Sequence, residues 1–446
     1  MLRLGRHVLP KVRRRLVRWG IAALLLVCAA AGLNKLFWNH HAKRFQELRP
    51  GVLYRTGQPS EWGLDYLVEW RGVKTVISLQ LYPANLRHGL YDHAKPSGGP
   101  EAAYVERLGA QPVHWSLGEE ACWPWPTPWV YESWFRTLDE PSNWPIAIHC
   151  QGGRHRTGTL AALFRLEYDR WPVERALAEM YSFKFGSPVP VQEHNLRTYF
   201  PRPRPGAEEW GALAAELSAW LTPQERGDYE TAVRALRSRR ADPSLQNALE
   251  DSLQRGVEFA MCLTARLVDS ADEPLACPVA ACAAKLLDNP AAAPRDWSTA
   301  AAVVADFGTS EQQSRLLALL SDEPRDAVVS PRYAALAAGV SNRYTINRIP
   351  YWRAMLDDSR HHPEPAAQKY RYCETAAARM SVVANQNFVE IEGHIADWSH
   401  AADRAGHWLA AHEQYAQLST LIGPEGPRVE HVAERENDEG RGAVRP

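Results

Sequence analysis

The sequence predicts an α/β domain with a central, mostly parallel sheet flanked by helices, followed by an all-α region. Short apolar runs alternate with amphipathic segments between residues 46 and 200, and a glycine-containing loop joins one of these runs to a helix. After residue 206 the composition becomes rich in Ala and Leu, with a helical pattern to about residue 421. A chain of 446 residues has room for two or three domains.

The elements of the first part follow from local patterns. Short apolar runs bounded by turn residues predict strands at 52–54, 74–79, 112–115 and 145–148. Apolar residues at helical spacing predict helices at 61–70, 101–108, 129–138, 157–168, 172–183 and 191–200. This alternation is typical of a parallel sheet with crossover helices.

The loop that joins the strand at 145–148 to the helix at 157–168 carries the chemistry. Residues 149–158 read His-Cys-Gln-Gly-Gly-Arg-His-Arg-Thr-Gly. A cysteine just before a helix lies where backbone N–H groups and the helix dipole stabilise a thiolate. Arg156 can curl back over the loop and donate two hydrogen bonds to a phosphate. A buried structural cysteine is the ordinary alternative, but the glycines and Arg156 argue against it.

This loop fits the pattern H-C-x-x-G-x-x-R-[S/T]-G and resembles the signature loop of the protein tyrosine and dual-specificity phosphatases. The stretches RPGVLYRTGQPS from Arg49 and GVKTVISL from Gly72 are similar to the opening of the small bacterial and plant-fungal dual-specificity-like members. The resemblance covers about residues 46–200 and implies a cysteine-phosphatase fold. It makes Cys150 the nucleophile and Arg156 the phosphate-binding arginine. A rhodanese-type sulfurtransferase would instead place the arginine one residue closer to the cysteine.

The resemblance also implies roles for the neighbouring residues, with no metal or organic cofactor. The phosphate-binding residues are then Gln151, Gly152, Gly153, Arg154, His155 and Arg156. Thr157 is expected to stabilise the thiolate as a leaving group, and His149 to tune it. Arg154 and His155 make the rim basic, which suits a polyanionic substrate. Arg154 could equally face solvent or pair with an acid.

Glu119 and Glu120 are the candidates for the general acid, which protonates the leaving oxygen. They precede Cys150 by about thirty residues, the distance at which the family places its acid loop. The family usually has an aspartate there, and this window has none. Each glutamate could instead be a solvated loop carboxylate. Asp139 is expected in the turn before the strand, out of reach of the substrate.

The N-terminal residues predict a membrane anchor. Residues 1–18 are basic, and an apolar run from Trp19 to Leu33 follows them. Extension to Trp38 gives a signal anchor at residues 19–38. The excess of basic residues before the run places the phosphatase outside the cytoplasm as a single-pass protein. Cleavage at residues 29–31, which would give a secreted protein, is the alternative.

Residues 201–206, which alternate proline and arginine, predict a linker, and 207–422 an α-helical domain that could bind a protein partner. Helix ends rich in Asp, Asn and Pro recur near residues 290, 324 and 358, as in HEAT-like hairpins. His361, His362 and His394 are expected on its surface. The charged tail at 423–446 is predicted to be disordered.

The sequence therefore predicts a membrane-anchored, cysteine-dependent phosphomonoester hydrolase that acts on a phosphorylated protein through a phosphocysteine intermediate at Cys150. One alternative is a phosphoinositide or inositol-phosphate phosphatase with the same mechanism. Another is a non-catalytic phosphate-binding protein whose helical domain mediates interactions. The net charge of −1 and the lack of a basic stripe argue against nucleic acid as a partner.

Overall fold

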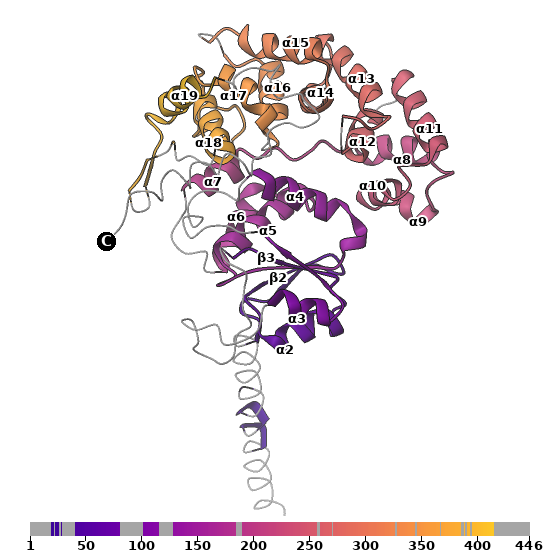
Figure 1. The fold of residues 1–446 in the computed structure, drawn as a ribbon, viewed down its shortest axis with the longest axis vertical. Coiled ribbons are helices and arrows are strands. Elements are labelled where there is room, and N and C mark those ends of the chain that lie inside the picture. The colour runs from indigo at the N-terminus through magenta and orange to yellow at the C-terminus, as the bar shows by residue number, and fades with distance from the viewer. Residues whose placement is uncertain are drawn as a thin grey trace, which may run out of the picture. The chain divides into compact units, whose positions relative to one another are not determined.

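The structure is a computed structural model of the chain (Figure 1). It describes residues 19–21, 23–25, 28, 41–80, 101–115, 128–183, 190–256, 259–269, 271–325, 328–343, 346–365, 367–384, 388, 390–392 and 395–413. These residues form two compact units, Met1–Ser116 with Trp144–Thr157, and Leu117–Asn143 with Gly158–Pro446. The boundary falls inside helix α5 (His155–Glu167), directly after Thr157.

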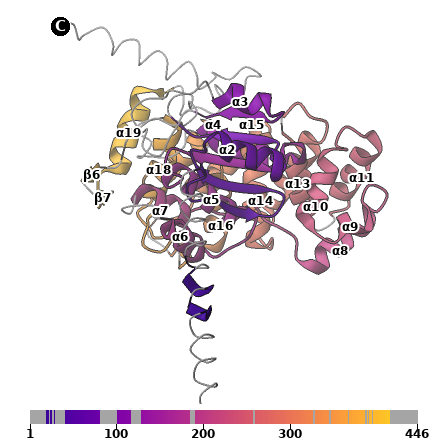
Figure 2. The ribbon, with the colours of Figure 1, turned by 90° about the horizontal axis from the view of Figure 1, so that it is seen from below.

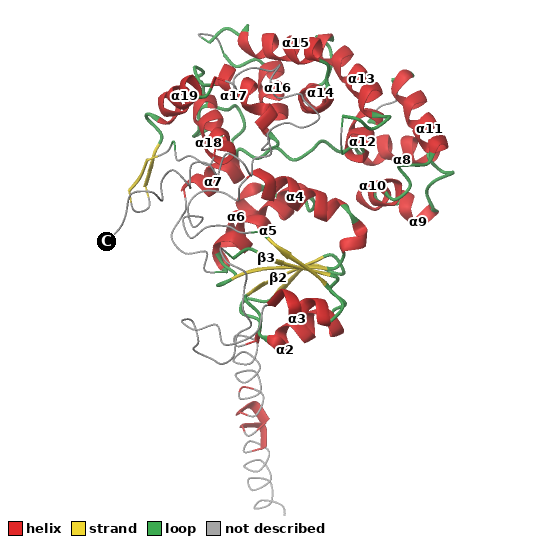
Figure 3. Cartoon of the chain, viewed as in Figure 1, coloured by secondary structure: helices red, strands yellow, loops and turns green. Residues whose placement is uncertain are grey.

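The first unit is built on a five-stranded sheet in the order β1-β2-β5-β3-β4. Its strands are drawn in yellow in Figure 3. The strands are β1 (Gln46–Arg49), β2 (Leu53–Gly57), β3 (Thr75–Ser78), β4 (Gln111–His114) and β5 (Ile146–Cys150). All are parallel except β1, which pairs antiparallel with β2. The predicted α/β class with a mostly parallel sheet is confirmed. Because parallel strands share one carboxyl edge, Gly57, Ser78 and Cys150 lie at the same edge.

Helical segments of the first unit cover an apolar face of this sheet. They are α2 (Glu61–Asp65), the π-helical turn η1 (Tyr66–Trp70) and α3 (Glu101–Arg107). Their buried side chains pack with those of the strands in one cluster, which includes Leu64, Leu67, Val105, Tyr54, Val76 and Ala147. The helix predicted at 61–70 is therefore present, but its second half widens into a π-helix.

Among its described residues, the second unit consists of helices and one short hairpin (Figures 1 and 2). Its helices before residue 260 are α4 (Pro128–Asp139), η3 (Pro141–Asn143), α6 (Val173–Ser182), α7 (Pro190–Arg197), α8 (Ala207–Glu216), α9 (Pro223–Arg226), α10 (Tyr229–Arg237) and α11 (Pro243–Gln254). The remaining elements are α12 (Ala260–Leu267), α13 (Ala276–Asp288), α14 (Pro294–Phe307), α15 (Ser310–Ser321), α16 (Pro331–Ser341), η4 (Ile346–Arg348), α17 (Ile349–Met355), α18 (Tyr372–Ala384), β6 (Glu390–Glu392), β7 (Ile395–Asp397) and α19 (Ala401–Ala411).

This confirms the predicted helical C-terminal region, whereas the β6–β7 hairpin was not predicted. The HEAT-like repeat and the predicted domain boundaries stay predictions. Residues 423–446 lie outside the described residues.

Asp139 is a buried anchor of the second unit rather than part of a turn. It is the last residue of α4, and its carboxylate accepts hydrogen bonds of 2.8 Å from Arg202, Arg266 and the Tyr168 hydroxyl. Burial alone would raise the pKa of Asp139, but the charges of Arg202 and Arg266 outweigh burial and hold it well below its usual range. Arg202 also pairs with Glu167 at 2.6 Å. The segment predicted as a linker is thus fixed by buried ion pairs.

Two buried histidines form a second polar centre in this unit. His194 on α7 and His362 both contact the Thr375 hydroxyl of α18, at 3.4 and 2.9 Å. His194 also stacks on Trp398, with ring centroids 4.3 Å apart. Burial lowers the pKa of His194 well below its ordinary value and that of His362 to about 3. The expected surface position is wrong for His362, which is 2% exposed, because it packs on the Tyr372 ring.

The predicted signal anchor at residues 19–38 is wrong. None of the helices in the described parts of the chain has the length and apolar character needed to cross a bilayer. The predicted single-pass topology depended on that anchor, and so did the extracytoplasmic placement of the phosphatase region. Neither prediction is supported without it. The physical reason is visible in the sequence: the apolar run from Trp19 to Leu33 is shorter than the roughly 20 residues that a span needs, and Lys35 follows it.

Replacing His362 with glutamine should flatten the pH dependence of stability. The folded protein keeps this imidazole neutral down to a pKa of about 3, whereas the unfolded chain takes up a proton near pH 6.5. The unfolded state therefore binds more protons between these pH values, and stability falls as the pH falls from 6.5 towards 3. When the pH is lowered from 7.5 to 5, the neutral His362 reduces the free energy of unfolding by about 2 kcal/mol.

Urea unfolding at these two pH values measures the effect. The wild type should lose about 2 kcal/mol more than His362→Gln. His361→Gln, which changes the exposed neighbour, is the matched control and should behave like the wild type. An equal pH dependence in wild type and His362→Gln would refute the assignment.

Candidate active site

Cys150 ends β5, the central strand, and stands in register with Gly57 of β2. It is a free cysteine with a side chain that is 5% exposed. Residues 151–154 turn the backbone, and α5 begins at His155, so the first N–H groups of the helix have no partner within it. The predicted strand, loop and helix are thus present. The thiol lies at the carboxyl edge of the sheet, where α/β proteins place their ligands.

Three consecutive carbonyl groups of the loop accept hydrogen bonds from donors outside it. The donors are the Gln58 N–H to Gln151 at 3.2 Å, the Arg44 Nη1 to Gly152 at 2.7 Å and the Arg55 Nη2 to Gly153 at 2.8 Å. In a planar trans peptide the C=O and the following N–H point in opposite directions. Donors that hold the carbonyls on one side therefore leave the next N–H groups facing the other side, available to an anion.

Gly153 lets the loop lie directly on the end of β2. Its φ is +62°, a conformation that side chains disfavour, and a Cβ there would stand 2.5 Å from the Gly57 nitrogen. Gly57 faces it: a Cβ on Gly57 would stand 3.1 Å from the carbonyl carbon of Gly152. The two glycines together allow the backbone contact on which the carbonyl hydrogen bonds depend.

Arg44 and Arg55 hold the loop, and the sequence assigned a role to neither. Arg55 is fully buried within β2, where a guanidinium needs acceptors. An arginine inside the apolar run VLYRTG was the available signal. Arg44 gave no such signal, because it lies in the turn before β1. Burial and then the charge of Arg154 lower the pKa of Arg44, while Cys150 raises it. Arg44 therefore adds positive charge close to the loop, on the side of its carbonyl groups.

Arg156 and Thr157 occupy the first turn of α5. The Arg156 Nη1 donates to the carbonyl of Leu79 at 2.9 Å, directly after β3. Because β3 pairs with β5, this places the guanidinium at the same edge of the sheet as Cys150. Thr157 is fully buried, and its hydroxyl has no hydrogen-bond partner among the described residues. Arg154 is exposed and His155 half-buried.

His149 is held by a buried carboxylate. Its Nε2 lies 2.7 Å from the Glu101 Oε1 at the start of α3, and both side chains are almost fully buried. This contact fixes the imidazole next to the cysteine, and the tuning role of His149 stays a prediction. Glu101 was not predicted, because the sequence shows it only as the first residue of a helix.

The structure does not describe the two candidates for the general acid. Glu119 and Glu120 lie outside the described residues. Within the described ranges, no group of three or more His, Cys, Asp or Glu side chains is arranged to hold a metal ion. The described residues bring a thiol, an arginine and a helix N-terminus to the same edge of the sheet, an arrangement that can bind an anion.

Comparisons with known proteins agree with this arrangement. A family model described as "Tyrosine phosphatase family" matches residues 127–200. The OCA1 protein of Mycosarcoma maydis, named as a tyrosine-protein phosphatase, is 30% identical over 133 residues, which cover 30% of this chain and 75% of that protein.

Two solved structures are also similar to part of the chain. The catalytic core of the PP-IP phosphatase Siw14 from S. cerevisiae has a TM-score of 0.29 and 20% identity, with 41% of this chain and 96% of that chain covered. TpbA from P. aeruginosa has a TM-score of 0.25 and 23% identity, with 33% and 81% covered. The assignment rests on the OCA1 protein, three quarters of which this chain spans. The chain belongs to the protein tyrosine/dual-specificity phosphatase superfamily.

Proposed function

We propose that this phosphatase hydrolyses phosphomonoesters with Cys150 as the nucleophile. The observation that supports this most strongly is the loop backbone, whose three carbonyls are bonded to Gln58, Arg44 and Arg55 on the side away from the anion. A thiolate at the floor of such a cradle can reach phosphorus while N–H groups bind the phosphate oxygens. A protein that only binds phosphate would not need the thiol.

The proposed reaction has two steps. The Cys150 sulfur attacks phosphorus in line, forming an S–P bond as the ester P–O bond breaks, and the leaving oxygen takes a proton from Glu119 or Glu120. Loop N–H groups and Arg156 stabilise the charge on the equatorial oxygens. In the second step water attacks the phosphocysteine, gives its proton to the same glutamate and releases phosphate. The Thr157 hydroxyl donates to the departing thiolate.

A phosphorylated protein is the first candidate substrate, and an inositol phosphate or phosphoinositide is the second. The observation that favours the second is the positive charge around the loop: burial and then the charge of Arg154 lower the pKa of Arg44. A substrate with several phosphates would offset that repulsion. Turnover of a phosphotyrosine peptide, a phosphoserine peptide, a soluble inositol phosphate and phosphoinositide vesicles by the full chain would distinguish these classes.

Replacing Cys150 with serine should abolish hydrolysis of p-nitrophenyl phosphate. A hydroxyl is a far weaker nucleophile than a thiolate, so kcat should fall on the order of 10³-fold or more. Arg156→Lys, which keeps the charge but loses the two-pronged contact, should lower kcat by about 10²-fold. Equal background rates in wild type and Cys150→Ser would mean that the chain only binds phosphate.

Gly153→Ala should remove most of the activity, whereas Gly152→Ala should cost far less. A Cβ on Gly153 meets the β2 backbone at 2.5 Å, while one on Gly152 meets only the Arg154 side chain at 3.7 Å. The strained position should also lower the free energy of unfolding by about 1–3 kcal/mol. Steady-state kinetics at a temperature where circular dichroism shows both variants folded is the measurement. Similar kcat values in the two variants would contradict the proposed loop geometry.

Glu119→Gln and Glu120→Gln, made separately, should identify the general acid. Phenyl phosphate has a poor leaving group and needs the proton, whereas p-nitrophenyl phosphate needs it much less. The variant that lacks the acid should slow phenyl phosphate by about 10²–10⁴-fold and p-nitrophenyl phosphate considerably less. If neither variant changes the ratio of the two rates, the proton comes from another residue.

A further inference from the structure

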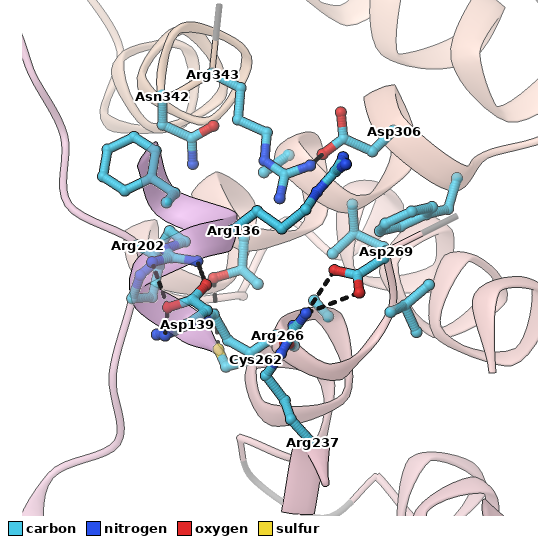
Figure 4. Close-up of a pocket in the computed structure, with 18 residues that line it drawn as sticks. Arg136, Asp139, Arg202, Arg237, Cys262, Arg266, Asp269, Asp306, Asn342 and Arg343 are labelled. Carbon is cyan, nitrogen blue, oxygen red and sulfur yellow. Dashed lines mark hydrogen bonds and ion pairs between the residues drawn. The ribbon is translucent and has the colours of Figure 1, made fainter. Parts of the chain in front are cut away.

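A pocket in the second unit is lined by arginines from five separate segments (Figure 4). They are Arg136 of α4, Arg202 after α7, Arg237 of α10, Arg266 of α12 and Arg343 after α16. The pocket has a volume of about 80 Å³, where roughly 10–15 Å³ is enough for one water molecule. Its lining also includes the apolar side chains of Phe135, Val268, Val303 and Phe307. None of these residues belongs to the loop around Cys150.

We infer that this pocket binds a small organic anion, with an acidic group on the arginines and a short apolar group on Val268, Val303 and Phe307. The first support is the charge. Each carboxylate that lines the pocket is shared by two guanidinium groups. Asp139 is shared by Arg202 and Arg266, Asp269 by Arg237 and Arg240, and Asp306 by Arg343 and Arg348.

Arginines still outnumber carboxylates when the carboxylates that pair with these arginines outside the pocket are included. Glu167 pairs with Arg202, and Glu230 pairs with Arg204 and Arg266. With Arg136 added, eight arginines of this network face five carboxylates among the described residues. A bound anion would neutralise part of this excess positive charge, whereas a bound cation would increase it.

The second support is a set of buried donors without partners. Arg237 and Arg266 are 6% and 5% exposed, and the Nε–H of each has no hydrogen-bond partner among the described residues. A buried donor left unpaired costs about 1–3 kcal/mol, so a ligand acceptor at these atoms would be favourable. The labelled side chains converge on one space in Figure 4.

Arg136 gives the pocket an accessible cation. It is exposed on α4, three residues before Asp139, and no described residue pairs with it. An exposed guanidinium of the lining that has no carboxylate partner can bind an incoming oxyanion without breaking an existing ion pair. Arg343, by contrast, shares Asp306 with Arg348, so Asp306 stays paired if Arg343 is replaced.

Calorimetric titration of the full chain with phenylphosphonate tests the inference. Its carbon–phosphorus bond is not the ester bond that a phosphatase cleaves. All variants carry Arg156→Gln, which weakens binding at the Cys150 loop. In this background the pocket should still bind the probe, and Arg136→Gln with Arg343→Gln should weaken that binding by about tenfold or more. Arg255→Gln with Arg315→Gln, which removes two exposed charges elsewhere, is the matched control and should leave it unchanged.

Two further measurements test whether the probe binds in the pocket itself and not to positive charge in general. Ala265→Phe fills the pocket and keeps every arginine, so it should also abolish binding. Inorganic phosphate lacks the apolar group and should bind at least about tenfold more weakly than phenylphosphonate. Absence of binding in the Arg156→Gln background, equal affinity in the two double variants, or equal affinity for the two probes would overturn the inference. Because catalysis is not the readout, these outcomes do not depend on the proposed reaction.

Discussion

The loop around Cys150 depends on hydrogen bonds that hold its carbonyl groups against the neighbouring strand. A run of peptide groups presents N–H donors to one side only if the carbonyls find partners on the other side. Here the partners are Gln58, Arg44 and Arg55, all from the segment around β1 and β2. The contact is close enough that only glycine fits at 153. The segment that begins the sheet is therefore a structural part of the site, although it is distant from Cys150 in sequence.

This dependence explains why the antiparallel β1 belongs to a sheet that is otherwise parallel. Arg44 lies in the turn just before β1, and the Gly57 N–H donates to the carbonyl of Lys43 at 2.5 Å. Pairing of β1 with β2 fixes the position of that turn beside the loop. On the other flank, Glu101 holds His149, so the cysteine is bounded on both sides by contacts that restrict its neighbours. These contacts suit the proposed role of Cys150, because a nucleophile held in this way needs little reorganisation when substrate binds.

Local sequence patterns predicted the strand, loop and helix around Cys150, because each depends on a contiguous apolar run or on glycine. They did not predict β1, whose four residues include one buried leucine and no alternating pattern. They also missed Glu101, Asp139 and His362, since the burial of a polar side chain depends on partners distant in sequence. The anchor failed for a different reason: a basic segment before an apolar run is common to signals and ordinary helices, and length decides between them.

Arginine has two different uses in this chain, and the difference follows from what its donors meet. At the loop, Arg44 and Arg55 donate to the carbonyl oxygens of Gly152 and Gly153 and so fix the course of the backbone. In the second unit most arginines meet carboxylates, which neutralise them and fix helix positions, as Arg202 and Arg266 do at Asp139. Only where arginines outnumber the carboxylates, as around Arg136, does the pairing leave charge for a ligand. Comparing the number of arginines with the number of carboxylates therefore distinguishes a site that can bind an anion from a network of ion pairs built from the same side chains.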